Sequence, residues 1–155
     1  MRIWCFAALG FSALLLAGAA QAPQEPRFVV LPSHSVPNIP ARVMHDVDSH
    51  PSWEPSTADI AVLEAGLERV SELNITGWPG SSLRIEHPER YFRQYIGVTH
   101  RKQHRIYINA FCDDPPPSDW RVHLYTVIDG ATCYWQALYD PVTKTFSTLT
   151  INARA

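Results

Sequence analysis

Five runs of residues in the C-terminal part of the chain limit what it can fold into. Each run is rich in β-branched and aromatic residues and is bounded by turn residues, which is the pattern of β-strands. The runs cover residues 91–98, 105–112, 122–128, 133–139 and 146–153. Because turn signals such as Asp129-Gly130 separate them, we expect an antiparallel sheet of four to five strands.

One long helix is predicted before the strands, over residues 56–73. Ser56 and Asp59 have the spacing of a capping box, which marks the start of a helix. Apolar residues then recur at helical spacing in a stripe of Ile60, Leu63, Leu67 and Val70, widened by Val62 and Leu73. An acidic row along one flank is expected to face water and consists of Glu64, Glu68 and Glu72. A long helix packed on an antiparallel sheet gives an α+β fold.

Residues 1–22 have the layout of a secretory signal peptide. Arg2 supplies the positive start, residues 3–19 are almost wholly apolar, and Ala20-Gln21-Ala22 offers a cleavage site. The alternative is an uncleaved membrane anchor, for which the apolar run is slightly short. We therefore expect export to the periplasm or the medium, with membrane contact only through this peptide before its cleavage.

Residues 23–56 are predicted to form an arm or linker, and residues 57–155 the α+β domain. The arm contains seven prolines and no sustained periodicity. Proline removes a backbone donor and restricts the residue before it, which favours extended chain. One apolar cluster, at residues 28–31, has the composition of a short strand that could join the sheet.

Cleavage after Ala22 leaves 133 of the 155 residues, with two cysteines, Cys112 and Cys133. In an oxidising compartment such a pair favours a disulfide, and two buried thiols are the alternative. A disulfide requires Cα atoms within about 7 Å of each other. A plain meander with a strand at residues 122–128 would hold the two cysteines apart, so the predicted disulfide argues against that simple strand order.

Charge and motifs exclude several classes of function. Without Arg2 the chain holds 12 basic and 15 acidic residues, a balance that argues against a nucleic-acid-binding protein. No serine lies in a G-x-S-x-G motif and no glycine-rich phosphate loop is present, so we predict neither an enzyme nor a bound cofactor. The alternative of a metal-binding protein rests on possible ligands in the arm, which are His45, Asp46, Asp48 and His50.

The first predicted hairpin carries the strongest indication of a binding surface. Alternate side chains of a strand lie on the same face, and one face of this hairpin is expected to project polar and aromatic groups into water. The six residues of this face are Tyr91, Arg93, Tyr95, Arg105, Tyr107 and Asn109. Tyrosine and arginine are favoured at the centres of protein interfaces, although the same tyrosines could instead stabilise cross-strand pairs. We predict a binding protein whose partner is another protein.

Several segments resemble a group of small exported bacterial proteins that have no established activity. The likeness rests on Arg93-Gln94-Tyr95-Ile96-Gly97, Ile106-Tyr107-Ile108-Asn109-Ala110-Phe111-Cys112, Cys133-Tyr134-Trp135 and Tyr139-Asp140-Pro141. A helix followed by strands is also similar to the cystatin-like arrangement. That resemblance implies a third function, the inhibition of a hydrolase by a secreted protein. However, Gln94-Tyr95-Ile96-Gly97 is one residue shorter than the Q-x-V-x-G loop of the inhibitory cystatins, and it lies within a predicted strand.

Overall fold

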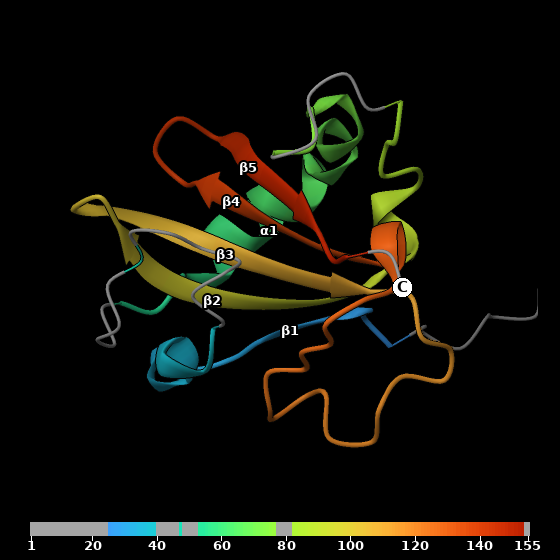
Figure 1. Ribbon diagram of the computed structural model, residues 1–155. Helices are drawn as coiled ribbons and strands as arrows, with labels where there is room; N and C mark the ends of the chain where they lie inside the picture. Colours follow the sequence, from blue (N-terminus) through green and yellow to red (C-terminus); the bar gives the residue numbers. More distant parts are fainter. Residues whose placement is uncertain (1–24, 40–46, 48–52, 77–81, 154–155) are drawn as a thin grey trace, which may run out of the picture.

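The computed structural model describes residues 25–39, 47, 53–76 and 82–153, and within them the fold is α+β with a five-stranded mixed sheet (Figure 1). The strands lie in the order β1-β2-β3-β4-β5. Their bounds are β1 (Phe28–Val30), β2 (Phe92–His100), β3 (Gln103–Phe111), β4 (Tyr134–Asp140) and β5 (Thr145–Ile151). The helical segments are α1 (Thr57–Ala65) and the 3-10 turns η1 (Ser33–Asn38), η2 (Leu67–Glu72), η3 (Pro88–Arg90) and η4 (Ala131–Cys133). The predicted signal peptide lies outside the described residues.

Strand β1 is parallel to β2, so the prediction of a wholly antiparallel sheet is wrong. Phe28 lies opposite Arg93, and the pairing continues with Leu31 N–H donating to the carbonyl of Tyr95 at 2.8 Å. Two parallel neighbours require a long crossover connection, and here the chain from β1 to β2 includes α1. The apolar cluster at residues 28–31 does join the sheet, as expected, although most of the sheet lies 60 or more residues further along the chain.

The hairpin between β2 and β3 turns on only two residues, Arg101 and Lys102. Both have positive φ, 49° and 65°, which is the backbone of a type I′ hairpin turn. This turn pairs His100 with Gln103, and the register then places Tyr95 opposite Ile108. Residues that lie opposite each other share a face, so the apolar residues of β3 lie on the same side as Tyr95 rather than on the other side.

Helix α1 ends at Ala65, with Gly66 as its C-terminal cap, and is therefore shorter than the predicted helix of residues 56–73. Gly66 has φ −107° and ψ 7°, and the chain continues as η2 instead of completing one long helix. Glycine is a poor helix former. The guanidinium of Arg69 also folds back here, bonding to the carbonyls of Gly66 at 3.3 Å and Lys144 at 2.9 Å. A Cβ at position 66 would lie 2.5 Å from Arg69 Nη2, so a larger residue here would shift the end of the Arg69 side chain. The capping box of Ser56 and Asp59 is confirmed.

One face of the sheet packs on the helical stripe, as predicted. The stripe residues Ile60, Leu63, Leu67 and Val70 are all buried, and they join the apolar side chains of β3, β4 and β5 in the main core. Leu73 packs against this core, whereas Val62 is 39% exposed and does not widen the stripe. The helical period is therefore a correct guide to the core across the break at Gly66.

The other face of the sheet is also covered. Leu31 and Val36, from the predicted arm, are buried against Ile96, Tyr107 and Leu138 in a second apolar cluster. In Figure 1, α1 lies on one side of the sheet, and η1 and the long loop after β3 lie on the other. Described residues of the arm thus form part of the fold, and the sheet is the middle of three layers.

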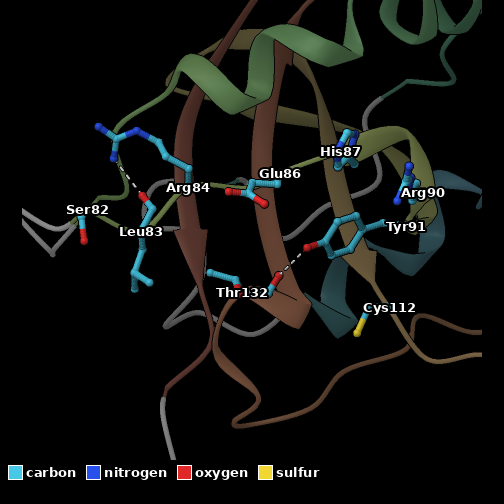
Figure 2. Close-up of a pocket in the computed structure, with 9 residues that line it drawn as sticks. All are labelled: Ser82, Leu83, Arg84, Glu86, His87, Arg90, Tyr91, Cys112 and Thr132. Atoms are coloured by element: carbon cyan, nitrogen blue, oxygen red, sulfur yellow. Dashed lines mark hydrogen bonds between the residues drawn. The ribbon is translucent and has the colours of Figure 1, made fainter.

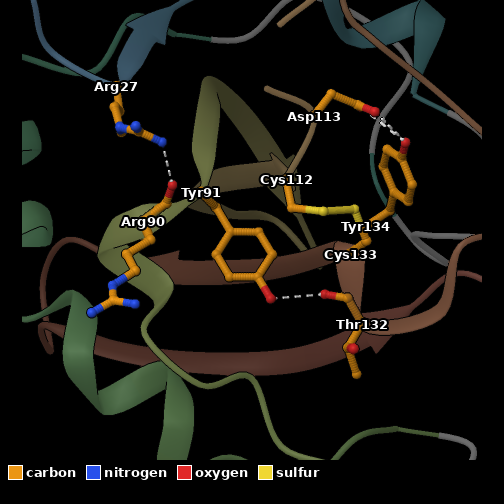
Figure 3. The surroundings of a disulfide bond; sticks show 8 residues. All are labelled: Arg27, Arg90, Tyr91, Cys112, Asp113, Thr132, Cys133 and Tyr134. Atoms are coloured by element: carbon orange, nitrogen blue, oxygen red, sulfur yellow. Dashed lines mark hydrogen bonds between the residues drawn. A yellow bond between two sulfur atoms is a disulfide. The ribbon is translucent and has the colours of Figure 1, made fainter. Parts of the chain in front are cut away.

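Cys112 and Cys133 form the predicted disulfide, with their Cα atoms 5.1 Å apart (Figure 3). The strand expected at residues 122–128 is absent, and this segment is part of a loop between β3 and β4. Because β3 and β4 are neighbours, with Phe111 opposite Tyr134, the two cysteines meet at the ends of adjacent strands. The objection to a simple meander from β2 to β5 was therefore wrong, since it depended on a strand that does not form.

Candidate functional site

The structure does not bring the six predicted binding residues together on one exposed face. Tyr95 is 0% and Tyr107 1% exposed, and both Arg93 and Asn109 are buried. The β2–β3 register places Arg93 and Tyr95 on the helix side of the sheet, and Tyr107 and Asn109 on the opposite side. The prediction of a wet face is wrong because the two-residue turn sets a different register and because the arm and the β3–β4 loop cover the second face.

Arg93 and Tyr95 form a buried ionic cluster with Glu64 of α1. The Arg93 guanidinium donates to both oxygens of Glu64, through Nη2 at 2.9 Å and Nε at 3.1 Å, and the Tyr95 hydroxyl donates to Oε1. Glu64 was predicted to face water, but its side chain is only 23% exposed. Burial raises the pKa of Tyr95 well above its usual value. For Arg93 burial acts to lower the pKa, but Tyr95 and Glu64 outweigh it and the pKa is raised.

Asn109 belongs to a row of buried amide side chains that crosses the second face of the sheet. This amide row consists of Gln94, Asn109, Gln136 and Asn152. Asn109 Nδ2 donates to Gln94 Oε1 at 2.9 Å and to the carbonyl of Tyr125 at 2.7 Å. Tyr125 N–H in turn donates to Gln94 Oε1 at 2.9 Å. Because buried amides must be paired, the amide row holds the loop against the sheet.

Arg105, near the start of β3, pairs with Asp140 at the end of β4. The Nη2 to Oδ2 distance is 3.1 Å and both side chains are largely buried. Burial acts to raise the pKa of Asp140, but the backbone N–H groups of Thr143 and Val142 and the charge of Arg105 hold it below its usual value. Arg105 therefore fixes the end of the sheet.

Tyr91 lines a pocket of about 610 Å³ beside the disulfide (Figure 2). The pocket is lined by Ser82, Leu83, Arg84, Glu86, His87, Arg90, Tyr91, Cys112 and Thr132. The Tyr91 hydroxyl donates to the carbonyl of Thr132 at 3.1 Å, and burial followed by the charge of Glu86 raises its pKa. Arg84 and Arg90 lie on opposite sides of the pocket in Figure 2, so it does not gather their charges at one point.

A second hollow, of about 710 Å³, lies between the start of the arm and the loop after β3. We call it the arm–loop cleft. Its walls come from the arm, α1, η3, β2 and the loop, and they consist of Glu25, Pro26, Arg27, Phe28, Glu64, Glu89, Phe92, Arg93, Pro116, Trp120 and Arg121. The ionic cluster of Glu64 and Arg93 lies in its wall. The volume falls in the range of about 300–1,000 Å³ that is typical of ligand sites.

Two arginines of the arm–loop cleft lie over aromatic rings. The guanidinium carbon of Arg27 lies 4.8 Å from the centre of the Phe92 ring, and that of Arg121 lies 4.5 Å from the centre of the Trp120 ring. The two rings pack edge to face, with their centres 5.3 Å apart. A cation–π contact of this kind helps to hold the guanidinium in place while its N–H groups bond to other partners.

Exposed carboxylates hold both guanidiniums. Arg121 Nη2 donates to Glu25 Oε2 at 2.9 Å, and Arg27 lies 3.9 Å from Asp114. Arg27 also donates to the carbonyl of Arg90 at 2.8 Å, as Figure 3 shows. The Glu25 and Asp114 side chains are 85% and 73% exposed. Exposed ion pairs of this kind contribute only about 0–1 kcal/mol each.

The metal hypothesis concerns residues that the structure does not describe, since His45, Asp46, Asp48 and His50 are outside it. Within the described ranges, no three His, Cys, Asp or Glu side chains are grouped so that they could hold a metal ion. The same ranges contain no helix that is long and apolar enough to cross a membrane.

Sequence reasoning missed the residues that define the arm–loop cleft, above all Arg27, Trp120 and Arg121. The only available signal was the pairing of an arginine with an aromatic residue at Arg27-Phe28 and Trp120-Arg121, in segments that appeared to be a linker and a loop. No protein family, curated protein or solved structure matches this chain.

Proposed function

We propose that the chain is an exported, non-enzymatic binding protein that recognises another protein through the arm–loop cleft. The observation that carries this proposal is the pair of guanidiniums, Arg27 and Arg121, held on adjoining aromatic rings at the wall of an open cleft. Arginine and large aromatic residues supply most of the binding energy in protein interfaces, particularly where they are packed and pre-oriented.

Rigid support for the cleft favours a binding role. Trp120 is buried and contacts both Phe92 and Phe111, at 5.3 and 5.9 Å between ring centres. The amide row anchors the following residues of the loop, and the disulfide closes the loop at its ends. A site whose side chains are already ordered loses less conformational entropy when it binds.

The non-enzymatic character rests on the state of the most buried charges in the cleft. Both oxygens of Glu64 accept from Arg93, and Tyr95 donates to the same carboxylate. A carboxylate held in this way is a poor general base, because its charge is neutralised by a guanidinium that cannot release its proton. We therefore assign Arg93 and Glu64 to the architecture of the cleft.

Export is supported by the signal-peptide pattern of residues 1–22 together with the disulfide, which is compatible with an oxidising compartment. The helix followed by the antiparallel strands β2 to β5 supports the cystatin-like arrangement as a proposal about fold kinship, and the likeness to small exported bacterial proteins is part of the same proposal.

Site-specific photo-crosslinking tests the proposed function. A photoreactive amino acid replaces Pro116, which lines the cleft, or Val142, which is 85% exposed at the β4–β5 turn and serves as the matched control. Each protein is irradiated in extract from the exporting cells and their medium, and adducts are identified by mass spectrometry. We expect a protein adduct from position 116 that position 142 does not give and that Arg121→Gln removes. The same adducts from both positions, or none from position 116, would refute the cleft as the binding site.

A further inference from the structure

We infer that the arm–loop cleft recognises an acidic segment of its partner in extended conformation, which replaces Glu25 and Pro26 of the chain itself. This inference rests on the proposed function, since it takes the cleft to be the binding site. The contacts that the cleft already makes indicate the chemistry of the partner.

The chain's own residues show what Arg121 recognises. Its Nη2 donates to the carboxylate of Glu25 at 2.9 Å and also to the backbone carbonyl of Pro26 at 3.4 Å. The Arg121 guanidinium thus binds an acidic side chain together with the main-chain carbonyl of the following residue. This pair of contacts suits any acidic residue in extended chain, because it depends on the carboxylate and the backbone rather than on a further side chain.

Glu25 and Asp114 are weak competitors for such a partner. Both carboxylates are largely exposed, and the Arg27–Asp114 distance of 3.9 Å is long for a charge-assisted hydrogen bond. Exposed pairs are screened by salt and contribute little to stability. A partner carboxylate whose segment also gains other contacts in the cleft can therefore displace them.

The charges left after this exchange favour an acidic partner over a basic one. Displacement of Glu25 and Asp114 removes the carboxylate partners of Arg121 and Arg27, although Arg27 keeps its bond to the carbonyl of Arg90. Glu64 offers no free charge to a basic ligand, since Arg93 occupies both of its oxygens. Electrostatic complementarity of this kind selects the partner's charge and fixes its register.

The position of the arm explains why the segment should be extended. Glu25 precedes Pro26, and the residue before a proline is driven to the extended region of the backbone. After a bend at Arg27 the chain enters β1 at Phe28, which pairs with β2. A partner segment that takes the place of Glu25 and Pro26 therefore leads toward the start of β1, beside the extended chain of Phe28–Val30. The ring of Phe28 and the stacked pair of Arg27 on Phe92 then form the wall beside it.

Isothermal titration calorimetry with two synthetic peptides tests the inference. The probes are acetyl-Ala-Glu-Pro-Glu-Phe-amide and its neutral counterpart, in which glutamine replaces both glutamates. The protein is purified after export, with its disulfide intact, and Arg121→Gln is compared with Lys102→Gln, which removes the same charge at the β2–β3 turn. We expect the acidic peptide to bind at least about tenfold more tightly than the neutral one, and Arg121→Gln, but not Lys102→Gln, to remove that preference.

Glu25→Gln gives a test in the opposite direction. This variant removes the intramolecular competitor, so the acidic peptide should bind about two- to fivefold more tightly, whereas a purely structural role of Glu25 predicts no gain. Equal binding of the two peptides, or equal effects of Arg121→Gln and Lys102→Gln, would overturn the inference. If a crosslink from position 116 persists in that case, only the acidic chemistry is wrong; if that crosslink is also absent, the proposed function fails with it.

Discussion

Replacing Glu64 by glutamine should destabilise the protein far more than the same change at Glu68. Both residues belong to one acidic row, but only Glu64 reaches the buried guanidinium of Arg93. In Glu64→Gln the amide oxygen can still accept from Arg93 Nε, whereas the amide nitrogen faces the donor Nη2, which now lies 2.9 Å from another donor. The change therefore removes one charge-assisted hydrogen bond and leaves a buried positive charge without its counter-ion.

The magnitude follows from these losses. A hydrogen bond to a charged group contributes about 1.5–3 kcal/mol, and breaking a fully buried ion pair costs about 3–5 kcal/mol. Glu64 is only partly buried, and Arg93 keeps acceptors in the carbonyls of Glu89 and Tyr91, so the lower part of this range applies. We expect Glu64→Gln to lower the free energy of unfolding by about 2–3 kcal/mol, and Glu68→Gln to change it by less than about 0.5 kcal/mol.

Urea unfolding followed by tryptophan fluorescence measures both variants under the same conditions. The slope of the transition should stay the same, so that the midpoint reports the change in stability. A loss below about 0.5 kcal/mol for Glu64→Gln, or an equal loss for Glu68→Gln, would show that the ionic cluster is not the tie between α1 and β2 that its geometry indicates.

Three further predictions concern the core and the loop. Burial is the chief cause of a raised pKa at four tyrosines, which are Tyr91, Tyr95, Tyr134 and Tyr139. Their contribution to stability should be fully present below about pH 10 and be lost above it, because the unfolded chain loses these protons first. The free energy of unfolding should then fall by up to about 1.4 kcal/mol per pH unit for each tyrosine. Tyr139→Phe removes a buried hydroxyl that has no hydrogen-bond partner. Urea unfolding of this variant should show unchanged or higher stability at pH 8, and a smaller loss of stability between pH 8 and pH 11 than in the parent protein. A loss of about 1 kcal/mol or more at pH 8 would contradict this. Asn109→Ala should cost about 2–3 kcal/mol and accelerate hydrogen exchange at Tyr125 N–H, while unchanged exchange there would mean that the amide row does not hold the loop. Reduction of the disulfide, whose cysteines are 21 residues apart, should lower stability by about 3 kcal/mol, as urea unfolding with and without reductant will test.

Periodicity in the sequence predicted the four central core residues of the helical stripe, although it also included Val62, which is exposed. Ile60, Leu63, Leu67 and Val70 are buried although the helix breaks at Gly66, because the stripe continues along η2. The disulfide was predicted from the expected oxidising compartment and the presence of two cysteines, without reference to the strand order. Both predictions depend on local pattern or on covalent chemistry, which a single sequence carries directly.

The candidate site could not be predicted because it depends on the pairing of strands. Type I′ turns usually contain asparagine or glycine, but here Arg101 and Lys102 form one, so no residue pattern indicated the register. A different register reverses the face of every residue on one strand, which is why Tyr107 and Asn109 were grouped with Tyr95. Asn109 was also predicted to face water, since polar side chains usually do, whereas here it pairs with Gln94 and with the loop.

The arm and the β3–β4 loop bury the predicted binding face, and the same two segments form the walls of the arm–loop cleft. Leu31 and Val36 dock the arm on the sheet, and the amide row docks the loop beside it. Arg27 and Arg121 are thereby brought to one site from positions 94 residues apart in the chain. Glu25 bonds to Arg121 across this junction, so the contact that a partner would replace is also one that joins arm to loop. Binding of an acidic segment should therefore leave the docking of Leu31 intact while it releases Glu25, and hydrogen exchange should slow in the loop but not in β1.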